Sequence, residues 1–166
     1  SKTTLRLRPF LAFRNKHSLS KANMDANVRS YPVVNGVKNR LYDGFPWLHM
    51  QMRKDSAKFI AAPDWYYDFE YQKELERGYE GYEDLLTTGY FEMDIEKGES
   101  IIFSASVDEM ASSEDIVEYF NTSIARRTHK IDFLSCLRHS ARQFVIRRPE
   151  NRTEVIAGYP WFGPLT

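Results

Sequence analysis

The sequence predicts a mainly β protein: an antiparallel β-sandwich followed by one or two C-terminal α-helices. Three observations lead to this prediction. Apolar residues recur at every second position through much of the first two thirds of the chain, the spacing becomes helical after Val107, and 166 residues are about the length of one domain. The composition agrees, because 42% hydrophobic and 14% aromatic residues with zero formal net charge exclude a disordered chain.

The first strands are expected where apolar residues alternate with other residues. Leu5–Phe13 and Trp47–Met52 show this pattern. Asn35 and Gly36 follow the apolar stretch Tyr31–Val34, and Asn-Gly is favoured in two-residue hairpin loops because both central positions need positive φ. The sequence therefore predicts a strand over each alternating stretch and a hairpin around Asn35-Gly36.

A second hairpin is expected around Lys97-Gly98. Apolar residues alternate with acidic residues over Phe91–Glu96, and they alternate again over Ile101–Val107. A turn signal between two alternating stretches predicts two paired strands with one buried face.

Two consecutive helices, or one bent helix, are expected after the last strand. Ser112 is a typical N-cap, and Asp115 is placed to return the hydrogen bond from three residues further on. Apolar residues then follow helical spacing over Ile116–Ile124 and again over Ile131–Val145, with Pro149 just beyond the end.

The zero net charge hides a segregation of charge along the chain. Residues 1–54 contain 11 basic and 2 acidic residues, whereas residues 64–84 contain 2 basic and 8 acidic residues. The two stretches either pack against each other, face a polar ligand or form two solvated faces, and the last interpretation is the one that charge alone favours. The balanced total argues against nucleic acid as a partner.

Several kinds of site are not expected. Cys136 is the only cysteine in the sequence, which excludes an internal disulfide and a four-cysteine zinc site and favours a reducing compartment, the cytoplasm. No two histidines stand at the i, i+4 spacing of a metal site, and no phosphate loop or dinucleotide motif occurs, so no metal and no cofactor is predicted. No apolar run reaches the roughly 18 residues of a membrane-spanning helix, so no membrane partner is predicted.

Aromatic residues gather in two stretches that suit a sugar. One surrounds Trp47, and the other is Trp65–Tyr71, where the rings are interleaved with Asp68 and Glu70. Sugars present apolar C–H faces edged by hydroxyl groups, and flat rings beside polar groups match them. The alternative is that the rings fill a sandwich core. Neighbouring carboxylates such as Glu83-Asp84 do not identify a glycosidase, whose two carboxyls must lie roughly 5–9.5 Å apart.

Three segments carry the motifs of a known family. They are Arg8–Leu19, Trp65–Tyr71 and Thr153–Gly163. The first two resemble the N-terminal domain of the bacterial and archaeal type of glycogen debranching enzyme, the amylo-α-1,6-glucosidases, and the third resembles the start of that family's catalytic barrel. In the family a large two-sheet β-sandwich, a supersandwich, precedes an α-helical (α/α)6 barrel that hydrolyses the α-1,6 branch-point glucose.

The resemblance implies a division into three parts. Residues 1–110 are expected to belong to the N-terminal β-sandwich, residues 111–150 to be linker helices, and residues 151–166 to be the truncated start of a barrel that is otherwise absent. Family members have further strands before the Arg8–Leu19 segment, so an incomplete sandwich is expected. Missing strands leave an unpaired edge, which makes self-association of the chain a further expectation.

The function that the resemblance implies is that of a non-catalytic region in an intracellular debranching glycoside hydrolase. The family's catalytic acid and base lie further along the barrel, and its Arg-Asp pair for the terminal glucose is absent, because this chain reads Gly163-Pro164-Leu165-Thr166. The expected partners are therefore the catalytic barrel of the same protein and α-glucan, as glycogen or maltooligosaccharides. A stand-alone carbohydrate-binding module and a purely structural or dimerisation domain remain as alternatives.

No catalytic residue is predicted in this chain, and the candidate substrate-binding residues come from three places. Trp161 and Phe162 match family positions that line the sugar pocket, and Trp161 is expected to stack on the substrate in the intact enzyme. The complete set is Tyr159, Trp161, Phe162, Trp47, Trp65, Tyr66, Asp68 and Glu70. Arg14 and His17 match a family motif and are expected to buttress the sandwich.

Overall fold

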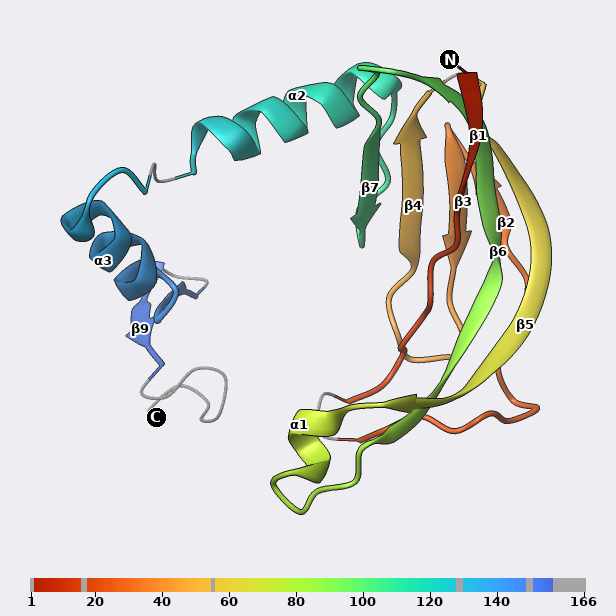
Figure 1. The fold of residues 1–166 in the computed structure, drawn as a ribbon, viewed down its shortest axis with the longest axis horizontal. Coiled ribbons are helices and arrows are strands. Elements are labelled where there is room, and N and C mark those ends of the chain that lie inside the picture. Colours follow the sequence, from red (N-terminus) through yellow and green to blue (C-terminus); the bar gives the residue numbers. More distant parts are fainter. Residues whose placement is uncertain (1, 16–17, 55, 128–129, 149–150, 157–166) are drawn as a thin grey trace. The chain divides into compact units, whose positions relative to one another are not determined.

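The computed structural model describes residues 2–15, 18–54, 56–127, 130–148 and 151–156 (Figure 1). The chain divides into two compact units, residues 1–121 and residues 122–166. The predicted fold class is confirmed, because strands dominate the first unit and helices follow them. None of the helices in these described ranges is long and apolar enough to cross a membrane.

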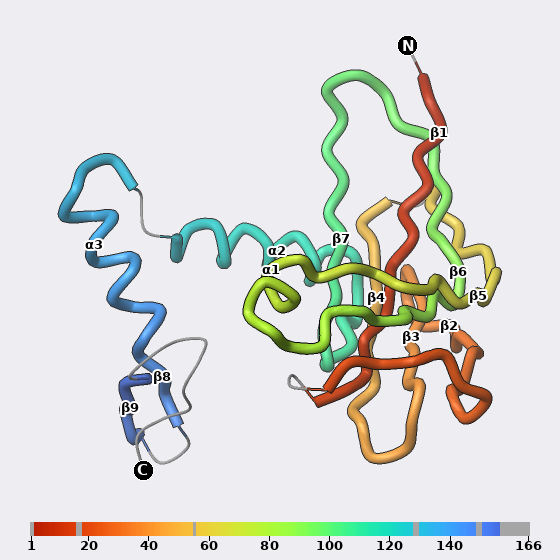
Figure 2. Tube along the Cα trace, turned by 60° about the horizontal axis from the view of Figure 1, so that its bottom comes forward, coloured from red at the N-terminus to blue at the C-terminus, as the bar shows by residue number. Residues whose placement is uncertain are grey.

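Two antiparallel sheets form the first unit. The first sheet has the order β1-β6-β5 and consists of β1 (Lys2–Leu7), β6 (Tyr82–Glu96) and β5 (Lys58–Glu70). The second sheet has the order β2-β3-β4-β7 and consists of β2 (Tyr31–Val33), β3 (Gly36–Asn39), β4 (Leu48–Arg53) and β7 (Ile102–Ser106). The long connection between β1 and β2 crosses the end of the sandwich at which α1 (Gln72–Leu75) lies (Figures 1 and 2).

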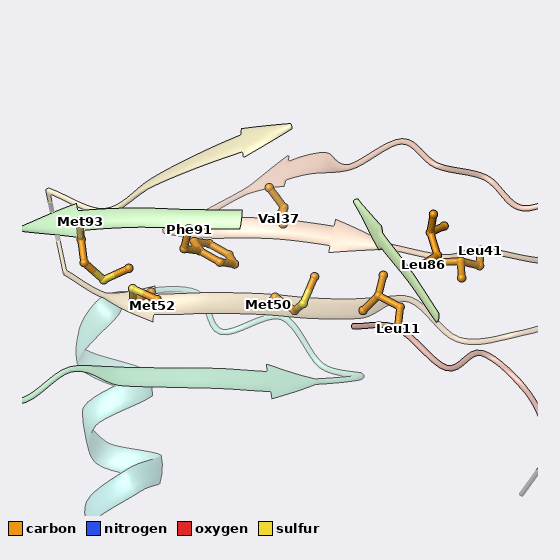
Figure 3. Packing of buried hydrophobic residues seen from close by; sticks show 8 residues of the cluster. All are labelled: Leu11, Val37, Leu41, Met50, Met52, Leu86, Phe91 and Met93. Atoms are coloured by element: carbon orange, nitrogen blue, oxygen red, sulfur yellow. The ribbon is translucent and has the colours of Figure 1, made fainter. Parts of the chain in front are cut away.

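The hydrophobic core lies between the two sheets (Figure 3). Both sheets contribute alternate residues to it, as the period-2 pattern predicts. Phe91 of β6 is 2% exposed, and its ring meets the rings of Phe59 and Phe103 edge-on at centroid distances of 5.1 and 5.6 Å. The other members of the cluster are Leu11, Val37, Leu41, Met50, Met52, Leu86 and Met93.

The hairpin predicted around Asn35-Gly36 is confirmed, with its loop one residue earlier. Val33 pairs with Gly36, so the two loop residues are Val34 and Asn35, and only Asn35 has a positive φ, of 53°. Gly36 already belongs to β3 and is required there for another reason. A Cβ atom at this position would lie 2.0 Å from the carbonyl oxygen of Met50, on the neighbouring strand β4.

The hairpin predicted over 91–107 is wrong. β6 pairs with β1 and β5 in the first sheet, whereas β7 pairs with β4 in the second sheet. The turn at Lys97-Gly98 therefore carries the chain from one sheet to the other. Both strands alternate because both face the same core, and alternation does not identify the strand with which each pairs.

The strand predicted over Leu5–Phe13 is interrupted. β1 ends at Leu7, and Leu11 rejoins the sheet through a single bridge in which its N–H donates to the carbonyl of Leu86 at 2.8 Å. Pro9 lies in the gap and has no N–H to give to a ladder, which explains the break. The strand predicted over Trp47–Met52 is confirmed as β4.

Helix α2 (Ser113–Ala125) begins at the predicted cap. The Asp115 N–H donates to Ser112 Oγ at 3.2 Å, and the Ser112 N–H donates to Asp115 Oδ2 at 3.0 Å. Gln51 of β4 fixes the approach to the helix, because its side chain donates to the carbonyl of Met110 and accepts from the Met110 N–H, both at 2.8 Å. Both faces of β4 are therefore buried.

The second unit contains α3 (Phe133–Arg142), β8 (Val145–Arg147) and β9 (Thr153–Val155). The predicted second helix exists, but its predicted end at Val145 is wrong. The chain leaves the helix after Arg142, and β8 pairs with β9 in an antiparallel ladder. The β-branched pair Val145-Ile146 favours a strand, and the Ile156 N–H extends the contact by donating to the carbonyl of Phe144 at 2.7 Å.

Candidate functional site

The most deeply buried acidic side chain in the described part of the chain is that of Glu83 on β6, with 0% exposure. It accepts hydrogen bonds from Arg14 Nε and from Arg14 Nη2, the latter at 3.0 Å. The Tyr71 hydroxyl donates to it at 2.6 Å, and the Ser20 N–H donates at 3.0 Å. All four donors converge on one carboxylate, so its charge is fully compensated within the fold.

This environment keeps Glu83 ionised. Burial raises the pKa of the carboxyl, but hydrogen bonds from Arg14, Tyr71 and the Ser20 N–H outweigh burial and lower the pKa from 4.5 to about 2. The hydrogen bond to the carboxylate and burial raise the pKa of the Tyr71 hydroxyl, although Arg14 acts in the opposite direction. A carboxyl group with so low a pKa is ionised near neutral pH, and its four hydrogen bonds within the fold make Glu83 a structural anchor.

Asp84 anchors the same segment from the next position on β6. Its Oδ2 accepts from the Ala22 N–H at 3.0 Å, and its Oδ1 accepts from the Asp68 N–H at 2.9 Å. Its own N–H donates to the carbonyl of Ser20 at 2.8 Å. These backbone hydrogen bonds lower the pKa of the Asp84 carboxyl. Glu83 and Asp84 together hold the connection between β1 and β2 against the end of β6.

These contacts bear on the interpretations of the segregated charge. The basic residues Arg14 and Lys21 lie in the first stretch, and their partners Glu83 and Asp84 lie in the second. The two stretches therefore make contact at these two pairs, whereas Lys2 and Arg6 pair with Asp94 and Glu92, outside the second stretch. The expectation that Arg14 buttresses the sandwich is confirmed, whereas His17 lies outside the described residues.

A second cluster lies on the outer face of the first sheet and is formed by Arg8, Phe10, Tyr66 and Tyr90. The guanidinium carbon of Arg8 lies 5.6 Å from the ring centroid of Tyr66 and 5.3 Å from that of Tyr90, and Nη1 donates to the Tyr66 hydroxyl. Phe10 meets the Tyr66 ring edge-on at 4.9 Å. We call these four residues the Arg8 cluster. It combines aromatic surface with a cation, two features that suit binding.

The chain around Trp47 forms a separate aromatic group on the second sheet. The indole of Trp47 meets the ring of Tyr31 edge-on at 5.3 Å. Two cations lie over the indole, with Lys38 Nζ 5.3 Å and the Arg40 guanidinium carbon 4.7 Å from its ring centroid. Arg40 is also paired with Asp43 at 3.0 Å. The indole is therefore already engaged by side chains of its own sheet.

A comparison with protein families matches residues 1–102 to the family described as glycogen debranching enzyme N terminal. The chain belongs to this family. Among curated proteins and among solved structures, no significant match was found. The matched range ends at the start of β7, so it includes the other strands of both sheets. It also includes Glu83 with its partners and the Arg8 cluster. The chain therefore contains the N-terminal region of a glycogen debranching enzyme.

The structure of this debranching-enzyme region places the predicted sugar-binding residues in different environments. Trp65 is partly buried and packs against the core, and Tyr66, the next residue, belongs to the Arg8 cluster on the outer face. Asp68 and Glu70 are both exposed, and Asp68 has a φ of 55° where β5 bulges. Tyr159, Trp161 and Phe162 lie outside the described residues, so their role stays a prediction.

Sequence reasoning missed the three other members of the cluster that contains Tyr66. Arg8 and Phe10 stand in the Arg8–Leu19 motif, which marked them as family residues but gave no reason to place them beside β5. Tyr90 is an aromatic residue adjacent to a core position, and it carries no signal of its own. The only indication in the sequence was the coincidence of two family motifs, which suggests shared structure without showing that the two segments touch.

The described residues contain no cluster of three or more side chains suited to a metal ion. One open polar hollow of about 570 Å³ lies where β1 begins and β6 ends. Charged residues such as Lys2, Lys54 and Glu99 line it. These charges are paired with each other, as Lys2 with Asp94 at 2.8 Å and Lys54 with Glu99. No residue of the Arg8 cluster lines this hollow.

Proposed function

We propose that this chain is a non-catalytic region of a glycogen debranching glycoside hydrolase, which supports the catalytic barrel and binds α-glucan. The observation that carries the glucan part is the Arg8 cluster, in which partly exposed aromatic rings lie beside a guanidinium group. Pyranose rings present apolar C–H faces to aromatic side chains and hydroxyl groups to hydrogen-bond donors. The cluster offers both kinds of contact.

The state of the carboxylates supports the non-catalytic part of the proposal. A glycosidase needs an acid whose pKa is raised, opposite a second carboxyl across the scissile bond. Within the described residues, every carboxyl whose pKa is displaced has a lowered pKa. The five are Glu83, Asp84, Asp94, Glu99 and Asp132. Each of them is engaged by hydrogen bonds or by a cation.

Two assays test this proposal on the purified chain. Isothermal titration with maltoheptaose should show saturable binding, and incubation with a branched α-glucan should release no glucose. Absence of binding at millimolar maltoheptaose would reject glucan binding and leave the structural alternative. Glucose release by the purified chain would reject the non-catalytic assignment. The cytoplasmic location stays a prediction and is tested separately by fractionation of cells that express the protein.

A further inference from the structure

Arg8 differs from the other arginines near it in how its charge is compensated. Arg6 is paired with Glu92 at 2.6 Å, and Arg14 is paired with the buried Glu83. Among the described residues, no carboxylate lies within ion-pair distance of Arg8, although its side chain is partly buried. Its contacts there are the two phenol rings and the Tyr66 hydroxyl. Most of its five N–H donors are therefore available to an acceptor from outside.

The neighbours of Arg8 hold its guanidinium in a fixed place. The rings of Tyr66 and Tyr90 lie on two adjacent strands, β5 and β6, and both approach the same guanidinium. A side chain fixed in this way loses little rotamer freedom when a ligand binds, which favours affinity. Phe10 adds an apolar surface, since it is 40% exposed although Tyr66 and Phe69 hold it at 4.9 and 5.2 Å.

Two other cations on the face that carries the Arg8 cluster are paired with carboxylates. Tyr90 is also approached by Arg6, whose charge is balanced by Glu92. Further along β1, Lys2 is balanced by Asp94 at 2.8 Å. These two cations are therefore compensated by carboxylates, whereas Arg8 is a cation whose N–H donors remain for the hydroxyl groups of a ligand.

Trp47, the alternative platform, is less suited to stacking on a sugar. The cations of Lys38 and Arg40 already lie 5.3 and 4.7 Å from its ring centroid, so at least part of the indole face is covered. Stacking there would require a cation to move. The Arg8 cluster needs no such rearrangement, because Phe10 is exposed as it stands.

We infer that the glucan-binding surface of this chain is the outer face of the first sheet at Arg8, Phe10, Tyr66 and Tyr90. Its ligand is a segment of the α-glucan chain that the proposed function names. Phe10 contacts a sugar face, and the donors of Arg8 that do not bond Tyr66 bind the hydroxyl groups. This inference rests on the proposed function, because it names the site at which the proposed glucan binding takes place.

The experiment compares maltoheptaose binding by the unaltered chain and by four variants, of which Trp47→Ala tests the alternative platform. Arg8→Gln should weaken binding about tenfold, because it removes charged hydrogen bonds. Phe10→Ala should weaken binding several-fold, since it removes the stacking surface. Tyr119→Ala is the matched control, because Tyr119 is an aromatic residue on α2 that is 64% exposed. Its affinity should equal that of the unaltered chain.

The outcomes separate this inference from the proposed function. If the unaltered chain binds maltoheptaose and both Arg8→Gln and Phe10→Ala bind equally well, the inferred site is wrong and glucan binding stands. Loss of binding in Trp47→Ala alone would lead to the same conclusion. If the unaltered chain does not bind, the glucan-binding part of the proposed function fails, and the inferred site fails with it.

Two further measurements cover misfolding and the nature of the ligand. In the unaltered, 15N-labelled chain, the Arg8 Nε–H resonance should shift on addition of maltoheptaose, which requires no variant to fold. No shift at saturation would overturn the inference. Inorganic phosphate should neither displace maltoheptaose nor shift the same resonance, and competition by phosphate would show that the cluster is an anion site.

Discussion

Replacing Glu83 by glutamine should destabilise the sandwich strongly while it preserves the shape of the side chain. The amide retains hydrogen-bonding atoms for Tyr71 and the Ser20 N–H, but it carries no charge opposite Arg14. Arg14 is then a largely buried cation, 21% exposed, that has lost its carboxylate partner. Removing one member of a buried ion pair is costly because the remaining charge is still desolvated.

The size of the effect follows from the displaced pKa. Folding lowers the pKa of Glu83 from 4.5 to about 2. Each pKa unit corresponds to about 1.4 kcal/mol, so the ionised carboxylate contributes about 3 kcal/mol to the free energy of unfolding at neutral pH. Measured costs for breaking buried pairs are of similar size, about 3–5 kcal/mol. We therefore expect Glu83→Gln to lower the free energy of unfolding by about 3 kcal/mol.

Urea unfolding followed by circular dichroism measures this loss at pH 7. The double variant Arg14→Met with Glu83→Leu is the informative companion, because it removes both charges and fills the space with apolar groups. It should be more stable than Glu83→Gln, since it leaves no buried cation that has lost its carboxylate. A loss below about 1 kcal/mol in Glu83→Gln, at an unchanged m value, would refute the assignment of Glu83 as the main anchor.

The pH dependence provides a second test of the same anchor. The pKa of Glu83 is lower in the folded state than in the unfolded state, so its contribution is complete above pH 4.5 and is lost as the pH falls towards 2. The difference in stability between the unaltered chain and Glu83→Gln should therefore shrink across this range. A difference that stays constant from pH 7 to pH 2 would contradict the lowered pKa.

Four further substitutions test the strand and helix contacts. Gly36→Ala should lower the free energy of unfolding in urea by about 2 kcal/mol, because the added Cβ would lie 2.0 Å from the Met50 carbonyl oxygen. The control Gly98→Ala should lower it by about 1 kcal/mol, because only the φ of 85° is unfavourable there. Equal losses in the two variants would contradict the close approach at Gly36. Met50→Ala should cost about 3 kcal/mol, because Met50 is 1% exposed in the core, and a loss below about 1 kcal/mol would place it outside the core. Ser112→Ala should cost about 1 kcal/mol and accelerate hydrogen exchange at the Asp115 amide, and unchanged exchange would exclude the cap.

Local signals predicted local structure well. The Asn35 turn, the Ser112 cap and the alternation over β4 depend on residues close together in the sequence, and the structure confirms each of them. Pairing between distant strands was not predictable in the same way. β6 and β7 carry the same pattern because both face one core, and the pattern contains no information about which sheet each strand joins.

The candidate site shows the same limit. Alternation over β5 places Trp65 and Tyr66 on opposite faces, but the sequence did not show which face is buried. The bulge beyond Tyr66 disturbs the alternation further. Arg8 reaches Tyr66 across 58 positions of sequence, a contact that depends on the complete first sheet. Only the shared family motif linked the two segments in advance.

The order of strands in the first sheet has a consequence for synthesis on the ribosome. Among the strands that the structure describes, β1 pairs only with β6, and the partners Lys2 and Glu96 are separated by more than 90 residues of chain. At translation rates of about 5–20 residues per second, β1 must wait roughly 5–18 s for its partner to be made. Because β5 and β6 are close together in sequence, we expect the β5–β6 ribbon to assemble before β1 docks. During this interval Lys2 and Arg6 keep the nascent strand charged, which discourages pairing with neighbouring chains on the same polysome.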